Sequence, residues 1–235
     1  MIRAAVVDYG AGNLVSIEQA LRSAGAAVAI VASGDVLDDA DLLVVPGVGA
    51  AGPAMARLTA AGLVDPIRRW IAADRPCLGI CLGLQLLFDS SEEDGARTLG
   101  IIPGHTIALR DAPTIPHTGW NQVARRRDHP AFAGIADGAD FYFVHSYAGA
   151  PGRAVAEAVT LATTTHGAPF VSAVARGRLL GVQFHPERSG DDGLRLLANV
   201  VALASPAVAA IGSGSHAAAL DTPPPRPGSS LPGGW

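Results

Sequence analysis

The stretch Cys77-Leu78-Gly79-Ile80-Cys81-Leu82-Gly83 carries the strongest fold signal in this chain. Its first four residues form an apolar run typical of a buried strand, and the apolar residues from Leu82 to Phe88 predict a helix. A strand that turns sharply into a helix holds the residue between them, Cys81, in strained backbone geometry. Such a turn needs glycine where a Cβ would clash, and Gly79 and Gly83 meet that need. The turn also places the thiol at a helix N-terminus, where the helix dipole and free N–H groups favour a thiolate.

Upstream of this turn, short β-branched runs alternate with amphipathic stretches, which is the pattern of consecutive βαβ units. The expected strands are residues 2–7, 28–31 and 42–45, and the expected helices are residues 14–24, 53–61 and 64–73. In the last of these helices, Ile67, Trp70 and Ile71 recur at helical spacing. The predicted fold class is α/β, with a mixed, mostly parallel sheet and helices on both faces.

Downstream of the turn, strands separated by turns predict antiparallel additions to the same sheet. They are expected at residues 122–124, 141–146, 171–174 and 179–184. A last helix is expected at residues 193–204, and its buried face should carry Leu194, Leu197, Val200 and Val201. Residues 205–235 are rich in Ala, Gly, Ser and Pro, which predicts a disordered tail after one domain at residues 1–204.

The composition excludes several classes of function. A net charge of −4 on 235 residues offers no basic surface for nucleic acid, and the absence of lysine excludes a Schiff-base mechanism. The two cysteines lie too close together for a structural disulfide, and no Cys/His spacing predicts a metal site, so we expect neither a metal nor a cofactor. The chain starts with a strand rather than a leader, and no apolar run approaches about 20 residues. We therefore expect a cytoplasmic protein without membrane contact.

A cysteine nucleophile needs a base, and the best candidate is His185 in Gln183-Phe184-His185-Pro186-Glu187. His185 follows the strand expected at residues 179–184, so it should lie at the sheet edge where α/β proteins bind ligands. Pro186 restricts the backbone and can hold Glu187 beside the imidazole, where a carboxylate would orient the ring.

Each of these residues also has a plainer interpretation. A lone cysteine is usually a small buried side chain, and a histidine beside a glutamate is usually a surface pair. The flanking glycines argue for the functional interpretation of Cys81, whereas Cys77, inside the strand, is predicted to be core.

The turn at Cys81, Gln85 and the motif His185-Pro186-Glu187 together resemble the class I glutamine amidotransferases, whose flavodoxin-like fold has three layers. Over roughly residues 2–203, the chain more narrowly resembles the glutaminase subunits of imidazole glycerol phosphate synthase. That resemblance rests on four motifs, Asp8-Tyr9-Gly10-Ala11-Gly12-Asn13-Leu14, Pro46-Gly47-Val48-Gly49, Pro116-His117-Thr118-Gly119-Trp120-Asn121 and Tyr142-Phe143-Val144-His145-Ser146-Tyr147.

The resemblance implies a complete glutaminase site. Cys81 would attack the carboxamide carbon of glutamine, His185 would transfer protons, and Glu187 would orient the imidazole. Ammonia would leave, and water would hydrolyse the glutamyl thioester to glutamate. The oxyanion hole is implied at the backbone of Val48, Gly49 and Leu82, in part on a loop that its glycines leave free to reorient. Contacts to the substrate are implied for Gln85, Glu93, Ser146 and Tyr147.

The resemblance also implies a partner, a cyclase subunit with a (β/α)8-barrel fold that receives the ammonia through an interior channel. Its products would be imidazole glycerol phosphate and aminoimidazole carboxamide ribotide, in histidine biosynthesis. Interface residues are implied at Asn13, His117, Trp120, Asn121 and Arg188. Arg188 departs from the lysine that the family usually carries after His-Pro-Glu, which keeps the charge but changes the geometry. For Trp120 the plainer interpretation is packing, and Phe143 is predicted to be core.

Three rival interpretations remain. The same chemistry could serve a different ammonia acceptor, the chain could be a noncatalytic binding subunit, or it could be an unrelated cysteine hydrolase. The four outer motifs disfavour the first rival and the complete triad disfavours the second. Gln85, combined with His185-Pro186-Glu187, disfavours the third.

Overall fold

A mixed eight-stranded sheet with the order β2-β1-β3-β4-β13-β12-β11-β8 forms the centre of the molecule. The computed structural model describes residues 1–34 and 37–205, so the tail predicted at residues 205–235 lies, apart from Ser205, outside the described residues. The strands are β1 (Arg3–Val7), β2 (Ala27–Val31), β3 (Leu42–Val45), β4 (Cys77–Ile80), β8 (Ala124–Arg125), β11 (Thr160–His166), β12 (Ala168–Arg176) and β13 (Leu179–Val182). The pairings from β2 to β13 are parallel and those from β13 to β8 are antiparallel, which confirms the predicted mixed sheet.

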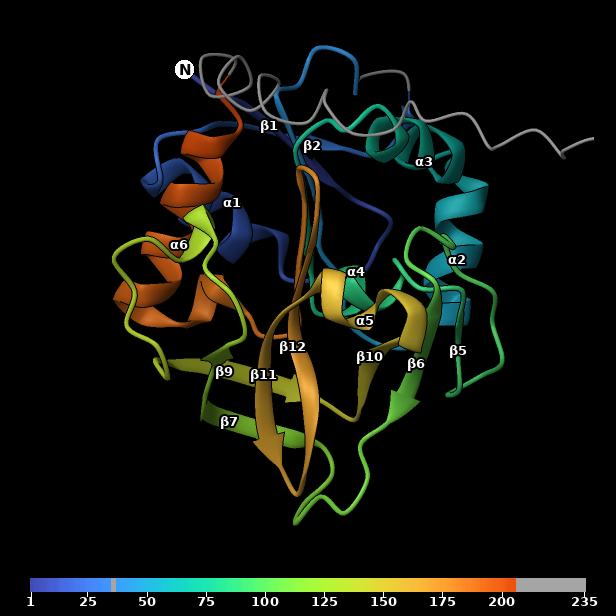
Figure 1. Ribbon diagram of the computed structural model, residues 1–235. Helices are drawn as coiled ribbons and strands as arrows, with labels where there is room; N and C mark the ends of the chain where they lie inside the picture. The colour runs from blue at the N-terminus through green and yellow to red at the C-terminus, as the bar shows by residue number, and fades with distance from the viewer. Residues whose placement is uncertain (35–36, 206–235) are drawn as a thin grey trace, which may run out of the picture.

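Helices cover both faces of the sheet, as the sequence predicts (Figure 1). On one face α1 (Leu14–Ser23) packs against α6 (Gly190–Leu203), and on the other lie α2 (Ala51–Ala60) and α3 (Val64–Ala72). All four residues of β3 and of β4 are buried, because each of these central strands is covered from both sides.

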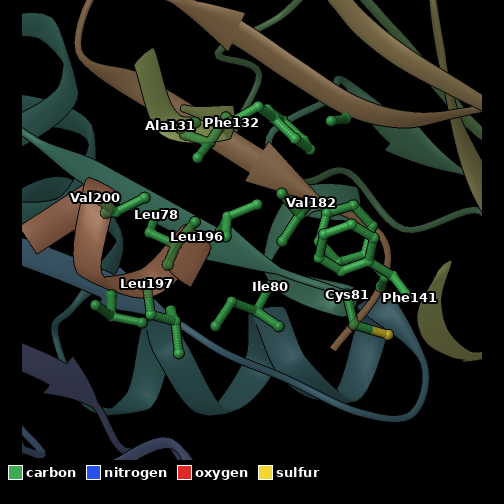
Figure 2. Packing of buried hydrophobic residues seen from close by; sticks show 14 of the residues in the cluster. Leu78, Ile80, Cys81, Ala131, Phe132, Phe141, Val182, Leu196, Leu197 and Val200 are labelled. Carbon is green, nitrogen blue, oxygen red and sulfur yellow. The ribbon is translucent and has the colours of Figure 1, made fainter. Parts of the chain in front are cut away.

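The buried face of α6 includes Leu196, Leu197, Val200 and Val201, so the prediction is confirmed for each of its members except Leu194. Figure 2 shows the first three of these packed toward the strand that carries Leu78 and Ile80. The prediction was wrong for Leu194, which is 40% exposed. The buried stripe is centred about a quarter of a turn away from this residue.

The helix after Cys81 is shorter than predicted, because α4 covers only Leu82–Gln85. The carbonyl oxygens of residues 86, 87 and 88 instead accept hydrogen bonds from the backbone of residues 99–102. These long-range bonds replace the helical ones, and so the apolar run up to Phe88 continues as buried turns.

Two small sheets accompany the central one. The first contains β5 (Ser90–Ser91), β6 (Gly104–Ala108) and β10 (Tyr147–Pro151), and the second pairs β7 (His117–Gln122) with β9 (Asp140–His145). Of these, the sequence predicts β9 well but not β5, β6 or β10, and it also misses β11 and the helix α5 (Arg153–Val159). The strand predicted at residues 122–124 is divided between β7 and β8.

The strands that the sequence misses lack apolar alternation. Strand β10 reads Tyr-Ala-Gly-Ala-Pro and β11 is rich in threonine, so their extended form depends on pairing with β6 and β12. None of the helices in the described part of the chain combines the length and apolarity that a membrane crossing requires.

Candidate active site

The turn between β4 and α4 has the strained geometry that the sequence predicts. Cys81 adopts φ 53° and ψ −108°, in the left-handed half of backbone space where residues other than glycine are uncommon. Its N–H donates to the carbonyl oxygen of Val182 at 2.8 Å, which fixes the turn to strand β13. A Cβ on Gly83 would overlap the carbonyl oxygen of Val45, and one on Gly79 would lie 2.8 Å from the carbonyl oxygen of Gly83. Both glycines are therefore required by close backbone packing.

His185 and Glu187 form a buried pair after β13, which ends at Val182, two residues earlier than predicted. The Nδ1 atom of His185 lies 2.8 Å from Oε1 of Glu187, and the two side chains are 7% and 2% exposed. The short 3-10 helix η3 (Pro186–Arg188) brings the carboxylate back toward the imidazole. Ser189 Oγ donates to the carbonyl oxygen of His185 at 2.6 Å and holds this turn in place.

The pKa of His185 is set by opposing effects. Burial lowers it, but the neighbouring Cys81 and Glu187 side chains raise it from 6.5 to about 10. Because this pKa is raised in the folded state, the interaction stabilises the fold fully below pH 6.5, and the stabilisation is lost as the pH rises toward about 10. The two neighbouring side chains therefore favour the charged form of the imidazole.

Replacing Glu187 by glutamine should lower the pKa of His185, because the substitution removes a negative charge that favours the imidazolium. The measurement is an NMR titration of the histidine ring signals between about pH 5 and 11. The Glu92→Gln variant is the control, since Glu92 lies at the surface and pairs with Arg110. If His185 titrates identically in wild type and Glu187→Gln, the carboxylate does not support the base.

One cavity of about 290 Å³ brings together most of the residues predicted for the substrate site. It is lined by Cys81, by Val48, Gly49 and Leu82 of the predicted oxyanion hole, by Gln85, Glu93, Ser146 and Tyr147 of the predicted substrate contacts, and by Pro116, Val144 and His145. Burial, followed by the charge of Asp94, raises the pKa of the Glu93 carboxyl. A smaller cavity beside it is lined by His185, Glu187 and Arg188, and by the predicted interface residue Asn13. Val48 and Val144 border both cavities.

Gln183 is a site residue for which the sequence predicts no role. Its Oε1 accepts from Nε2 of Gln85 at 3.1 Å, and its Nε2 lies 3.6 Å from Sγ of Cys81. The same Gln85 amide donates to the carbonyl oxygen of Tyr147 at 2.8 Å. The sequence does carry a signal that could have identified Gln183, which is its spacing of two residues from His185. Residues two apart at the end of a strand point to the same side.

The predicted oxyanion donors are not assembled in this structure. The N–H of Leu82 donates to the carbonyl oxygen of Gly47 at 3.3 Å. In a trans peptide the C=O and N–H point in opposite directions, so the N–H of Val48 points away from Leu82. Gly49, with φ of 90° and open space around it, gives the loop a pivot. Tyr9 Oη fixes the other end of this loop through its hydrogen bond to the carbonyl oxygen of Pro46 at 2.8 Å.

The thiol and the imidazole are likewise not hydrogen-bonded to each other. Among the described residues, Nε2 of His185 and Oε2 of Glu187 are buried without a partner. The Sγ atom of Cys81 instead lies 3.9 Å from the carbonyl oxygen of Val144. Hydrogen bonds between catalytic groups can be long in a free enzyme, so this spacing is compatible with the predicted pairing of thiol and imidazole.

The residues predicted for the partner interface fall into two groups. Trp120 is 58% exposed, so the packing interpretation was wrong for this side chain. It contacts Tyr142 edge to face, and the Arg188 guanidinium lies 4.1 Å from the centre of the Tyr142 ring. His117, in contrast, is only 3% exposed and presents no surface for direct contact with a partner.

The remaining two interface predictions, Asn13 and Asn121, differ in exposure. Asn13 is exposed and caps α1 by accepting from the N–H of Ser16 at 3.3 Å. Asn121 is partly buried, and its side chain turns inward toward His117 and the carbonyl oxygen of Thr165. Phe143 and Cys77 are buried, as predicted.

Comparison with known proteins agrees with this arrangement. A sequence model of the family Glutamine amidotransferase class-I matches residues 5–203. The fold is similar to that of PurLQS from Thermotoga maritima (TM-score 0.69, 19% identity, 87% of this chain and 100% of that one). It is also similar to a putative GMP synthase subunit from Thermoplasma acidophilum (TM-score 0.66, 19% identity, 91% of this chain and 98% of that one). The chain belongs to the class-I glutamine amidotransferases.

Curated relatives place it more narrowly. The Imidazole glycerol phosphate synthase subunit HisH of Dehalococcoides mccartyi is 44% identical over 201 residues, which cover 85% of this chain and 97% of that protein. The corresponding subunit of Chloroflexus aurantiacus is 48% identical over 202 residues, which cover 84% of this chain and 94% of that protein. Within its class, the chain is a member of the family of HisH subunits of imidazole glycerol phosphate synthase.

Proposed function

We propose that this chain releases ammonia from glutamine through a Cys81–His185–Glu187 triad and supplies it to a cyclase subunit in histidine biosynthesis. The observation that carries the proposal is the shared site at the end of β4 and β13. There Cys81 opens into the same cavity as Gln85, and the His185–Glu187 pair borders the adjoining one.

At the start of the first half-reaction, Cys81 has given its proton to His185, so the sulfur is a thiolate and the ring is an imidazolium. Sγ attacks the carboxamide carbon of glutamine, and the oxyanion is held by the N–H of Leu82 and, once the loop has reoriented, by that of Val48 or Gly49. His185 then donates its proton to the departing nitrogen. The C–N bond breaks, ammonia leaves, and a glutamyl thioester remains on Cys81.

The second half-reaction regenerates the enzyme. Neutral His185 accepts a proton from water as the water oxygen bonds to the thioester carbon. The C–S bond then breaks and glutamate leaves. Glu187 holds Nδ1 of the imidazole throughout, so that Nε2 exchanges protons with thiol, ammonia and water in turn.

The destination of the ammonia is a cyclase subunit with a (β/α)8-barrel fold. Support comes from the HisH relatives, which are named as subunits of imidazole glycerol phosphate synthase. The surface residues that would meet this partner are the exposed Trp120, Asn13 and Arg188. Asn121 is partly buried and would support this surface from below. In such a complex the ammonia would pass directly to the cyclase site and yield imidazole glycerol phosphate and aminoimidazole carboxamide ribotide.

Glutamate release by the purified chain should be slow, and adding the cyclase subunit with its nucleotide substrate should accelerate it about a hundredfold. The reason is that Leu82 and Val48 do not present an oxyanion hole at rest, and one such donor is worth roughly 10²–10³ in rate. The measurement is glutamate formation in a coupled dehydrogenase assay, with an unrelated (β/α)8 barrel as control. If the cyclase leaves the rate unchanged while the chain hydrolyses glutamine, the acceptor is a different one.

A further inference from the structure

Three histidines meet beneath the β7–β9 pair, outside the triad. His117 lies on β7, His145 ends β9 and His166 ends β11. The His117 ring stacks on His166, with ring centres 4.0 Å apart, and on Phe143, with ring centres 4.9 Å apart. His117 and His145 are 3% and 6% exposed, so the hydrogen bonds of their ring nitrogens are made inside the protein.

The hydrogen bonds of these rings determine where their protons lie. Nδ1 of His145 is 2.8 Å from the carbonyl oxygen of Tyr147, which can only accept, so this nitrogen carries the proton. Nε2 of a neutral His145 must then accept, and it lies 3.1 Å from Nδ1 of His117, which therefore donates. Nε2 of His117 accepts in turn from the side-chain amide of Asn121 at 3.1 Å. All donors in this series of hydrogen bonds point the same way, from Asn121 to Tyr147.

The surroundings keep both rings neutral, as this arrangement requires. Burial lowers the pKa of His117 to about 4, with a smaller contribution from the charge of His166. Burial also lowers the pKa of His145 to about 3, although its bond to the Tyr147 carbonyl acts in the opposite direction. A positive charge on any of the neighbouring rings of His117, His166 and His185 would lower it further. Among the described residues, no set of three His, Cys, Asp or Glu side chains is placed to hold a metal ion.

The chain of hydrogen bonds ends at the cavity that contains the nucleophile. The carbonyl oxygen of Tyr147 accepts from both His145 and Gln85, at 2.8 Å each. Gln85 also donates to Gln183, whose own amide lies 3.6 Å from Sγ of Cys81. A buried series of polar contacts thus runs from Asn121 on β7 to the thiol.

We propose that His117 and His145 are positioning residues that fix the Tyr147 carbonyl, and with it the Ser146–Tyr147 wall of the glutamine site. Neither residue touches the reacting atoms. Through Asn121, the same series of hydrogen bonds connects this wall to the face where a partner would bind. The inference rests on the proposed glutaminase function, because it assigns glutamine to that cavity.

The donor-to-acceptor direction of these hydrogen bonds is tested first by ring ¹⁵N NMR of the full-length protein at pH 7. Both His117 and His145 should be neutral with the proton on Nδ1, which the ring shifts distinguish from the Nε2 form. Signals are assigned by their loss in His117→Asn and His145→Asn. If either ring is protonated on Nε2, or is charged, the proposed series of hydrogen bonds does not exist.

The effect on the site is tested by glutamine binding, measured calorimetrically in a Cys81→Ala background so that no substrate is consumed. His117→Phe keeps the aromatic stack but removes the donor to His145, and it should weaken binding about threefold to tenfold, the effect of one lost hydrogen bond. His117→Asn places an amide near the Nδ1 position and should restore binding to within about twofold. His166→Phe alters the same aromatic stack but removes no member of the hydrogen-bond series, so this variant should bind glutamine as the parent does.

The outcomes separate this inference from the proposed function. If the Cys81→Ala parent binds no glutamine and the wild type releases no glutamate, the glutaminase assignment fails, whatever the NMR shows. If the parent binds but His117→Phe binds equally well, the positioning role is refuted. Equal weakening by His166→Phe would also refute it, because packing alone would then explain the loss. In the complete synthase, His117→Phe should raise KM for glutamine and leave kcat within about twofold, as expected for lost substrate binding.

Discussion

The Cys81→Ala variant is expected to release glutamate from glutamine at least about 10³ times more slowly than the wild type, even with the cyclase partner present. Without Sγ there is no thioester, and direct attack by water would have to pass a barrier at least about 4 kcal/mol higher. Cys81 is buried, at 5% exposed, but the substitution removes only one sulfur atom, so we expect the surrounding fold to stay in place. Unfolding of the variant, followed by circular dichroism, should confirm this.

The second cysteine provides the matched control. Cys77 lies at the start of the same strand, and burial raises the pKa of its thiol to about 12. Cys77→Ala should therefore retain glutaminase activity, and iodoacetamide should label Cys81 but not Cys77 in the folded protein. Wild-type rates in Cys81→Ala, or inactivation by Cys77→Ala without unfolding, would overturn the assignment of the nucleophile.

The Gly83→Ala variant should lose about 3 kcal/mol or more of unfolding free energy. The added methyl group would overlap the carbonyl oxygen of Val45, which belongs to the backbone of β3 and cannot turn aside as a side chain could. Strand β3 is paired with β1 on one side and β4 on the other, so any shift would disturb the centre of the sheet. Chemical denaturation monitored by fluorescence measures the loss.

Gly152→Ala is the matched control for this substitution. Gly152 has φ of −59° at the start of α5, and a Cβ there would meet its nearest neighbour, the carbonyl oxygen of Pro103, at 3.4 Å. Its stability should change by less than about 1 kcal/mol. If Gly83→Ala proves equally harmless, the close packing of the turn against β3 is not what makes glycine necessary there.

Local signals account for what the sequence predicts well. The turn at Cys81 is encoded by glycines within two residues of it, and the His185–Glu187 pair by a proline between them, so no distant contact is needed to anticipate either. The central strands β3 and β4 are equally clear, because burial on both faces leaves unbroken apolar runs.

Features that depend on distant partners were missed. The end of α4 is decided by carbonyl oxygens whose donors lie more than ten residues further along the chain. His117 resembles a surface residue in the polar run His-Thr-Gly-Trp-Asn-Gln, because its partner His145 is 28 residues away. The carbonyl oxygen of Gly47 accepts from the N–H of Leu82, 35 residues further along the chain, and no sequence pattern encodes this contact.

The hydrogen bond between Leu82 and Gly47 has a metabolic consequence under the proposed mechanism. A glutaminase whose oxyanion hole were always formed would drain cellular glutamine and discard its nitrogen whenever the acceptor nucleotide was scarce. One backbone hydrogen bond contributes only about 0.5–1.5 kcal/mol, so a docking partner can readily exchange it for contacts of its own. A single reversible peptide rotation would thus make nitrogen expenditure depend on demand for the pathway's product.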